Sequence, residues 1–324
     1  MKILHLNDYL SGYGGSEVVM NNIVRVSSHE GEISTFEDAQ DLDSYDLIHV
    51  HNVWSKNFDK LKGRKLVMSI HDYRLTKCMI GMRLCEAENR NCLTCRGLLG
   101  FYLNHLRIRP LWKFVDKQSP TLVVHSSYMK DYYKPKFDTT YMPIPLEVKD
   151  MNPSDNHEDY LFFSARCSNE KNPFAFARMC KEIGIKGIMA LTISNTYFKR
   201  YMRQLQKFPN IEVFIEPEFK EQVDLYRHAK LTVHPYKYAE PFGISCVNSI
   251  LCGTPLLSYP YGNLPHVSTL TAYGYEPLKN MVIGALESPS FYEALVKKTL
   301  DMRKEFVDEF DCGKRWDNFY EGIA

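Results

Sequence analysis

Residues 2–28 read KILHLNDYLSGYGGSEVVMNNIVRVSS and contain one complete structural unit. Residues 2–7 form a short apolar run that is typical of a buried first strand, and residues 15–28 form an amphipathic stretch. The glycines between these two parts permit a tight turn. The segment therefore predicts a strand, a glycine-rich turn and a helix in succession, which is the repeating unit of a parallel sheet.

The same alternation continues along the whole chain. The other apolar runs of the first half lie at 47–52, 65–71 and 121–127. A second series follows, with apolar runs at 160–166, 187–193, 211–216, 231–235 and 255–260. Because amphipathic stretches separate most of these runs, the pattern is that of parallel sheets covered by helices on both faces. We therefore predict an α/β protein with two doubly wound, Rossmann-like domains.

The boundary between the two series falls in a proline- and acid-rich stretch at 140–155, which is typical of a linker. A chain of 324 residues is long for a single core, so two domains are expected. We place the first domain at 1–147 and the second at 148–311. The tail is helical in pattern with a break at Asp311–Gly313, which allows a last helix at about 312–324 to pack back on the first domain.

Composition and charge limit the classes of function. The formal net charge is +1, which argues against a general attraction to nucleic acid. A local basic group is predicted to be a solvated helix face; its members are Arg96, Arg107, Arg109 and Lys113. No apolar run is long enough to span a membrane, and the N-terminus lacks the pattern of a signal peptide. The nine cysteines then favour reduced thiols and a cytoplasmic location.

The segment Ser11–Glu17 lies between the first strand and the first helix, where backbone amides and the helix dipole can hold a phosphate. It is not the dinucleotide fingerprint, because Glu17 occupies the position of the third glycine after Gly12 and Gly14. It is not a Walker loop either, since no Gly-Lys-Ser/Thr follows. A phosphate-binding turn and a plain tight turn both remain open.

Two further strand ends carry polar groups in the second domain. Arg166 and Lys171 follow the apolar run at 160–166, where a doubly wound sheet binds its ligand, and two cations of this kind suit a diphosphate. Glu240–Ile244 follows the run at 231–235 and precedes a helix. The carboxylate there can accept hydrogen bonds from sugar hydroxyls, and the amides after Phe242 can hold oxygens.

The ordered set of motifs resembles the retaining glycosyltransferase family four, which has the GT-B fold. The motifs are Gly14-Gly15-Ser16-Glu17, Ser69-Ile70-His71-Asp72, the pair Arg166 and Lys171, Glu240-x-Phe242-Gly243, and Cys252-Gly253-Thr254-Pro255. The resemblance covers nearly the whole chain. It implies two Rossmann-like domains facing across a cleft, with the nucleotide-sugar held mainly by the C-terminal domain and the acceptor by the N-terminal one.

The resemblance also implies roles for individual residues. Arg166 and Lys171 would neutralise the donor diphosphate, so that no metal is required for catalysis. Glu240 would bind the donor sugar, helped by amides of the segment Phe242, Gly243 and Ile244. In the first domain, Gly14 and Gly15 would close over the diphosphate, and His71 would orient or polarise the sugar. The other residues expected on the acceptor side are Asp72, Tyr73 and Glu17.

The sequence departs from the family at the second glutamate of the Glu-x7-Glu motif, where it has Asn248. In addition, the glycine-rich loop that usually ends in glutamate reads YGNLPH at Tyr261–His266. The asparagine carbonyl can still accept a hydrogen bond from a ribose hydroxyl, but it lacks the charge that strengthens such a bond. Altered donor binding is therefore expected, and UDP-, GDP- and ADP-sugars all remain candidates.

A cluster of cysteines, Cys78, Cys85, Cys92 and Cys95, follows the His-Asp motif and includes a Cys-x-x-Cys. Four thiolates in a short irregular segment resemble a structural zinc knuckle, with free thiols or disulfides as the alternatives. Elsewhere, His49 and His51 alternate along one predicted strand and so share a face, where hydrogen-bonded core positions are expected.

These observations predict a retaining glycosyltransferase that moves a sugar from a nucleotide-diphosphate sugar to an acceptor hydroxyl. A glycan or lipid-linked saccharide is the expected acceptor, and a helix with Arg107, Arg109 and Trp112 could bring the protein to the inner face of a membrane. Two alternatives stay open. One is glycosyl transfer to a modified nucleic-acid base, and the other is a sugar-nucleotide-binding protein without turnover.

Overall fold

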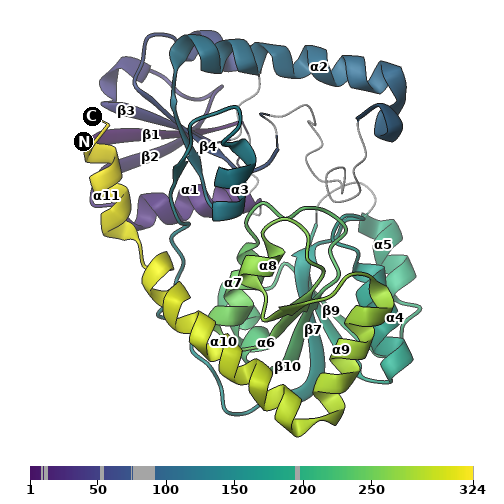
Figure 1. Cartoon of the computed structure of the whole chain (residues 1–324). Helices are drawn as coiled ribbons and strands as arrows, with labels where there is room; N and C mark the ends of the chain where they lie inside the picture. The colour runs from purple at the N-terminus through teal and green to yellow at the C-terminus, as the bar shows by residue number, and fades with distance from the viewer. Residues whose placement is uncertain are drawn as a thin grey trace. The chain divides into compact units, whose positions relative to one another are not determined.

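The structure is a computed structural model that describes residues 1–8, 10, 14–51, 55–73, 75, 92–193 and 198–323. It divides into two compact units (Figure 1). Unit 1 comprises Met1–Leu146 and Phe310–Ala324, and unit 2 comprises Glu147–Glu309. Each unit holds its own six-stranded sheet with flanking helices, so the predicted class of two doubly wound α/β domains is confirmed.

The sheet of unit 1 has the order β2-β1-β3-β4-β5-β6, and all pairings among its described strands are parallel. The strands are β1 (Lys2–Asn7), β2 (Glu30–Thr35), β3 (Leu47–His51), β4 (Leu66–Ile70), β5 (Thr121–Val124) and β6 (Thr140–Tyr141). The helices are α1 (Gly15–Val26), η1 (Leu42–Ser44), η2 (Ser55–Leu61), α2 (Cys92–Gln118), α3 (Ser127–Tyr133) and α11 (Gly313–Glu321).

The C-terminal helix α11 is part of unit 1. Trp316 and Tyr320 are fully buried there, and the indole N–H of Trp316 donates to the carbonyl of Pro143 at 2.9 Å. In the same helix, the carboxylate of Asp317 accepts a hydrogen bond from the hydroxyl of Ser27 at 2.7 Å. Gly313 begins the helix, and a Cβ there would lie 2.9 Å from the carbonyl oxygen of Val26. The chain end is therefore tied to the first helix and to the core of unit 1.

The sheet of unit 2 has the order β12-β11-β10-β7-β8-β9 and is also parallel in its described pairings. Its strands are β7 (Glu158–Arg166), β8 (Lys186–Thr192), β9 (Ile211–Ile215), β10 (Ala229–His234), β11 (Leu256–Ser258) and β12 (Leu270–Thr271). Its helices are α4 (Pro173–Ile183), α5 (Phe198–Leu205), α6 (Phe219–His228), α7 (Ile244–Leu251), α8 (Leu264–Val267), α9 (Tyr275–Glu287) and α10 (Pro289–Phe310).

The strand order of unit 2 reverses between β7 and β10. From β7 the chain proceeds to β8 and β9 on one side, and from β10 it proceeds to β11 and β12 on the other. The loops that leave these two neighbouring strands therefore turn to opposite faces of the sheet, and doubly wound sheets bind their ligands at the carboxyl ends of such strands. In unit 1 the corresponding point lies between β1 and β3.

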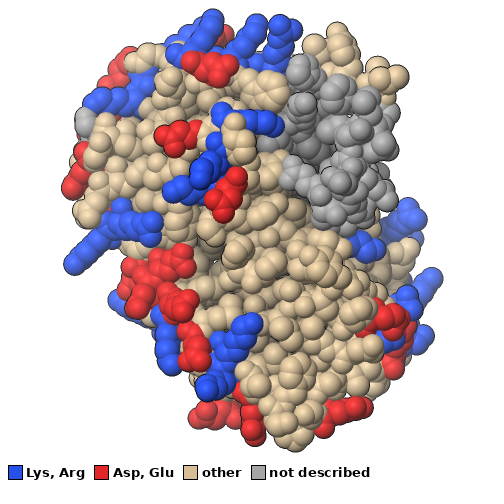
Figure 2. All heavy atoms as spheres, in the orientation of Figure 1, with Lys and Arg blue, Asp and Glu red and all other residues tan. Residues whose placement is uncertain are grey.

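Charged side chains of both signs are distributed around the drawn face of the molecule, and uncharged side chains occupy much of the drawn face of unit 2 (Figure 2). Within the part of the chain that the structure describes, no helix combines the length and the apolar character needed to cross a bilayer.

Candidate functional site

The strand ends of unit 2 bring together Lys171, after β7, and Glu240, after β10. The Nζ of Lys171 lies 2.7 Å from Oε2 of Glu240, although the two residues are separated by 69 positions in sequence. Only 8% of Lys171 and 7% of Glu240 is exposed, so this ion pair is buried. The pair follows from the topology, because β7 and β10 are the two adjacent strands at the switch point.

Two tyrosines surround this ion pair. The Nζ of Lys171 lies 4.0 Å from the ring centroid of Tyr236 and 4.9 Å from that of Tyr238, so both aromatic rings help to hold the cation. The hydroxyl of Tyr238 donates to Oε2 of Glu240. Burial and the neighbouring carboxylate raise the pKa of Tyr238 well above its usual value, so this hydroxyl keeps its proton and remains a donor. Neither tyrosine was selected from the sequence, although both alternate with His234 at the end of β10.

Glu240 is fixed from a second direction by the loop Tyr261–Asn263. Gly262 has a φ of +67° and pairs with Glu240 as an isolated parallel bridge. A Cβ on Gly262 would lie 2.3 Å from the backbone nitrogen of Glu240, so glycine is required both for its conformation and for the close approach. The backbone N–H of Asn263 donates to the carbonyl of Glu240 at 2.7 Å, and its side chain donates to the carbonyl of Phe242 at 2.7 Å.

The helix α7 begins directly after this segment. Gly243 is its N-cap, with a φ of +96°, and Ile244 is its first residue. The free amides and the dipole at this helix end favour oxygen atoms of a ligand. One turn further, Asn248 is 6% exposed, and its Oδ1 has no hydrogen-bond partner among the described residues. A buried acceptor without a partner is costly, so Asn248 is suited to a ligand hydroxyl.

The loop between β7 and α4 is held against the loop after β10. The side chain of Asn172 donates to the carbonyl of Pro235 at 3.0 Å, and the N–H of Lys237 donates to the carbonyl of Glu170 at 2.7 Å. Ser168 is also buried, and its Oγ has no partner among the described residues. Arg166, the last residue of β7, is exposed. The strand ends thus offer one buried cation, one exposed cation, a carboxylate and a helix N-terminus, which suits an anionic ligand that also carries hydroxyls.

In unit 1, Gly14 is the N-cap of α1 and Gly15 is its first residue. The side chain of Glu17 folds back over this helix end: a Cβ on Gly14 would lie 1.9 Å from its Oε2. Glu17 is 4% exposed, and a carboxylate at this helix end is stabilised by the dipole. An anionic ligand approaching Gly14 would require Glu17 to rotate away. The positions Ser11, Gly12 and Tyr13 lie outside the described residues.

His71, Asp72 and Tyr73 follow β4. His71 and Asp72 are half-buried, whereas Tyr73 is 5% exposed and packs edge-on against Tyr132 at a centroid distance of 5.0 Å. Tyr133 donates to the carbonyl of Asp72 at 2.8 Å. The ring of Tyr73 is therefore packed in the interior. In the segment 71–73, the partly accessible side chains are those of His71 and Asp72.

A cluster of histidines lies beside His71. Parallel pairing aligns His5 with His49, and His51 with Ser69, so these side chains share one face of the sheet. Four of the rings are almost completely buried, with exposures of 3% or less; they are His5, His49, His51 and His125. Ring nitrogens of His5, His49 and His51 lie within 4.8 Å of one another, a spacing that could also suit a metal. The sequence predicted the shared face of His49 and His51, but not the other members.

Most of the predicted cysteine cluster lies outside the residues that the structure describes. Cys78 and Cys85 lie outside the described residues, and Cys92 and Cys95 are in the first turn of α2, with side chains that also lie outside the description. Five other cysteines are buried and are not part of a disulfide; they are Cys167, Cys180, Cys246, Cys252 and Cys312. Burial raises the pKa of the Cys252 thiol to about 12, and it shifts the pKa of Cys167, Cys180 and Cys246 in the same direction, which disfavours the thiolate form that a nucleophile needs.

The helix α2 exposes an apolar stripe. Its members recur with helical spacing; they are Leu98, Leu99, Tyr102, Leu103 and Leu106. Arg109 and Lys113 are exposed further along the same helix, and the side chains of Arg96 and Arg107 lie outside the described residues. Trp112 faces inward instead, because its indole N–H donates to the carbonyl of Leu75 at 2.8 Å.

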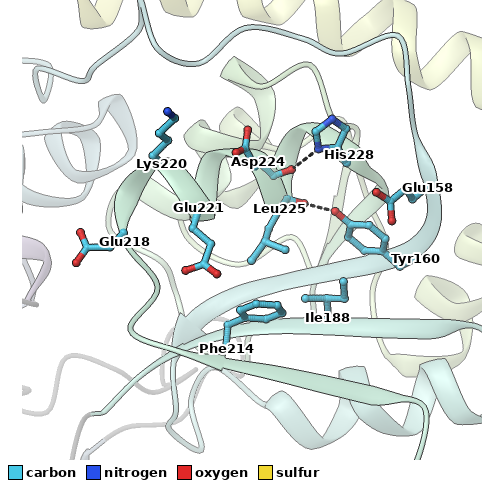
Figure 3. A pocket seen from close by; sticks show the side chains of 10 residues that line it. All are labelled: Glu158, Tyr160, Ile188, Phe214, Glu218, Lys220, Glu221, Asp224, Leu225 and His228. Atoms are coloured by element: carbon cyan, nitrogen blue, oxygen red, sulfur yellow. Dashed lines mark hydrogen bonds between the residues drawn. The ribbon is translucent and has the colours of Figure 1, made fainter.

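A hollow of about 650 Å³ lies elsewhere in unit 2, between α6 and the strands β7, β8 and β9 (Figure 3). Its acidic lining residues are Glu158, Glu218, Glu221 and Asp224. Tyr160 donates to the carbonyl of Leu225 at 2.8 Å, and His228 to that of Asp224 at 3.0 Å. Four carboxylates and one lysine, Lys220, give this lining an excess of negative charge, so the hollow is a poor site for a diphosphate, in contrast to the strand ends.

Comparisons with known proteins agree with this geometry. Residues 147–298 match the family model described as glycosyl transferases group 1, and this range contains all the strand-end residues of unit 2 named above. No curated protein matches the sequence.

Solved structures resemble the chain over nearly its full length. Alr3699/HepE of Anabaena, in complex with UDP-glucose, has a TM-score of 0.75 at 15% identity and covers 99% of this chain and 100% of its own. Sucrose-phosphate synthase of Thermosynechococcus elongatus has a TM-score of 0.74 at 13% identity, covering 99% and 98%. A glycosyltransferase of Rickettsia africae has a TM-score of 0.66 at 9% identity, covering 99% and 97%. The chain therefore has the GT-B fold.

Proposed function

We propose that the protein is a retaining glycosyltransferase that moves a sugar from a nucleotide-diphosphate sugar to an acceptor hydroxyl. The observation that carries this proposal is the buried pair of Lys171 and Glu240 at the switch point of unit 2. The pair lies within the residues that match the glycosyl transferases group 1 model. A cation for the diphosphate and a carboxylate for sugar hydroxyls are thereby adjacent at the same strand ends.

The donor would be held by unit 2. Lys171 and the exposed Arg166 would bind the diphosphate oxygens, with amides at the start of α7 as further donors. Because Lys171 already pairs with Glu240, the diphosphate would share this cation with the carboxylate. Glu240 would accept hydrogen bonds from the sugar, and the unpartnered Oδ1 of Asn248 would accept one from a ribose hydroxyl.

The first donor to examine is UDP-glucose, since HepE is similar in fold and is in complex with it. GDP- and ADP-sugars belong in the same panel, because Asn248 replaces a charged ribose contact with a neutral one. A neutral acceptor is expected to lower the affinity for the ribose without abolishing it.

The chemistry proposed is a front-face substitution. The bond from the anomeric carbon to the leaving phosphate breaks while the acceptor hydroxyl attacks from the same side, and the leaving phosphate takes the hydroxyl proton. Arg166 and Lys171 would stabilise the developing charge on the nucleotide diphosphate, as a divalent metal does in other transferases. His71 would orient or polarise the sugar, with Asp72 on the acceptor side and Gly14 and Gly15 near the diphosphate.

The acceptor proposed is a glycan or a lipid-linked saccharide at the inner face of a membrane. The exposed apolar stripe of α2, followed by the exposed Arg109 and Lys113, supports a peripheral contact with an anionic bilayer. Cosedimentation with vesicles of neutral and of anionic lipid tests this contact. Binding that requires anionic lipid and falls in a Leu99→Ser/Leu103→Ser variant is expected, and binding to neither vesicle contradicts it.

Release of nucleotide from a panel of UDP-, GDP- and ADP-sugars, with and without saccharide acceptors, tests the transfer reaction. Lys171→Ala and Glu240→Ala are expected to lower turnover by at least a factor of about 100, consistent with loss of a charge-stabilising group. Lys186→Ala is the matched control, because Lys186 also forms an ion pair in unit 2, at 2.8 Å from Glu212, but at the start of β8. Donor binding without turnover would instead identify a sugar-nucleotide-binding protein.

The cysteine cluster remains a proposed structural zinc knuckle. Metal analysis of the purified protein is expected to give zinc that disappears when Cys78 and Cys85 are replaced by serine. Retention of activity after removal of that zinc is expected, because its role would be to hold a loop. Loss of turnover together with intact donor binding would argue for a catalytic role instead.

A further inference from the structure

The buried histidines of unit 1 form two separate rows of hydrogen bonds. The first row joins Tyr320, His49, Ser69, His125 and the carbonyl of Met142, with successive distances of 2.7, 2.8, 3.2 and 2.9 Å. The second row joins His5, His51 and His71: Nδ1 of His5 lies 3.3 Å from Nε2 of His51, and Nδ1 of His51 lies 3.1 Å from Nε2 of His71. His71 is the member of the second row to which the sugar contact is assigned.

The protons of the first row are fixed by its last member. A carbonyl only accepts, so Nδ1 of His125 carries a proton and its Nε2 accepts from Ser69. Ser69 then accepts from Nε2 of His49, and Nδ1 of His49 accepts from the hydroxyl of Tyr320. Burial raises the pKa of Tyr320 well above its usual value, in agreement with a hydroxyl that donates. Every bond of this row therefore has one direction.

The protons of the second row are not fixed in this way, because both bonds join two imidazole rings. A neutral imidazole donates from one nitrogen and accepts at the other. If His5 donates from Nδ1, then His51 accepts at Nε2 and donates from Nδ1 to Nε2 of His71, so that His71 carries its own proton on Nδ1. In the opposite direction, all three rings carry the proton on Nε2. A mixed arrangement would break at least one of the two bonds.

Burial keeps His5 and His51 neutral at ordinary pH. It lowers the pKa of His5 to about 3, and it lowers that of His51 well below the usual value, with repulsion from neighbouring rings adding to the effect. An extra proton therefore does not reside on His5 or His51, and these two rings hold no charge. The row can still transmit a choice between two arrangements, one with the proton on Nδ1 of every ring and one with the proton on Nε2 of every ring.

We propose that His5 and His51 are positioning residues that set the tautomer of His71, by requiring all three rings to carry their protons on the same ring nitrogen. This inference rests on the proposed function for the role of His71, but not for the coupling itself. Nε2 of His71 faces His51, so the ligand contact proposed for His71 would be made by its other nitrogen, Nδ1. Polarising a sugar oxygen needs a donor there, which selects the order with the proton on Nδ1 in all three rings.

The test is nuclear magnetic resonance of the ligand-free protein with 15N-labelled histidine, in which the two ring nitrogens report the tautomer directly. The same tautomer is expected in His5, His51 and His71, with Nδ1 protonated. Different tautomers in these three rings would overturn the coupling. Nε2 protonation in all three would uphold the coupling and count against a polarising role of His71, so the two proposals fail separately.

Variants of His51 separate a positioning role from a structural one. His51→Phe removes both bonds, and the ring shifts of His71 are expected to move toward those of free histidine. His51→Asn places an amide near the former Nδ1, and it is expected to restore one tautomer at His71. The matched control is His49→Phe, which is equally buried but belongs to the first row; it is expected to lower stability and leave the tautomer of His71 unchanged.

The alternative to these hydrogen-bonded rows is a metal ion held by the rings of His5, His49 and His51. Both nitrogens of His49 are already engaged, by Tyr320 and by Ser69, so a metal would have to displace one of these partners. Zinc that is retained when Cys78 and Cys85 are replaced by serine, and that is lost in His49→Phe, would overturn the inference. Metal analysis of the two variants decides the matter without any measurement of activity.

Discussion

Mild acid is expected to destabilise unit 1 selectively. Four of its histidines are buried, and burial lowers the pKa of each below its usual value; they are His5, His49, His51 and His125. As the pH falls through about 6.5, these side chains take up protons in the unfolded chain but not in the folded one. The stability that these four neutral histidines contribute is therefore fully present above that pH and is lost progressively as the pH falls below it.

The size of the effect follows from proton linkage. Between about pH 7 and about pH 5.5, each such histidine lowers the free energy of unfolding by about 1.3 kcal/mol, and four lower it by about 5 kcal/mol. This approaches the whole stability of a typical domain, which is about 5–15 kcal/mol. Unit 2 has a single fully buried histidine with a strongly lowered pKa among its described residues, His234, and a half-buried one, His157, so its loss is smaller.

The assay is urea unfolding at a series of pH values. Trp54, Trp112 and Trp316 are the only tryptophans of the chain, and all three belong to unit 1, so their fluorescence follows this unit alone. Hydrogen exchange measured by mass spectrometry follows both units. The unfolding midpoint of unit 1 is expected to fall steeply between about pH 7 and about pH 5.5, and His125→Gln is expected to reduce that dependence by about one quarter. A midpoint that does not change with pH, or equal losses in both units, would refute the reasoning.

Three further predictions concern the strand ends of unit 2. Glu240→Gln or Lys171→Met is expected to lower the free energy of unfolding in urea by about 3–5 kcal/mol, because one charge then stays buried alone. The double variant Lys171→Met/Glu240→Leu is expected to recover part of this loss. A loss below about 1 kcal/mol in each single variant would mean that the ion pair is solvated. Gly262→Ala is expected to abolish donor binding because the added Cβ displaces Glu240. The control is Gly274→Ala, which also has a positive φ (+91°) but whose added Cβ would lie 4.0 Å from the nearest neighbouring atom, so donor binding is expected to be retained. Equal binding by the two variants in calorimetry would contradict this prediction. Asn248→Ala is expected to leave the unfolding free energy nearly unchanged and to weaken donor binding by about 1 kcal/mol, as for a lost hydrogen bond; unchanged affinity would remove the ribose contact.

Much of the fold could be predicted because its signals are local. Each apolar run followed by an amphipathic stretch specifies one strand and one helix, and short connections between such units favour parallel sheets. The sequence places the domain boundary at 147/148, and the structure divides the chain between Leu146 and Glu147. The break at Asp311–Gly313 also appears, as the interval between α10 and α11.

The candidate site was predictable only in part. Lys171 and Glu240 could be selected because each follows an apolar run at a strand end. Their ion pair, however, depends on β7 and β10 being neighbours, and the contact of Gly262 with Glu240 depends on a loop folding back. The histidine rows show the same limit: spacing predicts that His49 and His51 share a face, but only the register between strands brings His5, His71 and His125 beside them.

Isothermal titration calorimetry with UDP-, GDP- and ADP-sugars tests the central proposal most directly. The intact protein is expected to bind one member of this panel. Lys171→Ala is expected to lose at least about 2 kcal/mol of the binding free energy, because charge-assisted hydrogen bonds to the donor are lost. Lys186→Ala is expected to bind like the intact protein. Equal binding by all three proteins would contradict a donor site at the strand ends of unit 2, and binding of no nucleotide-sugar would contradict the proposed function.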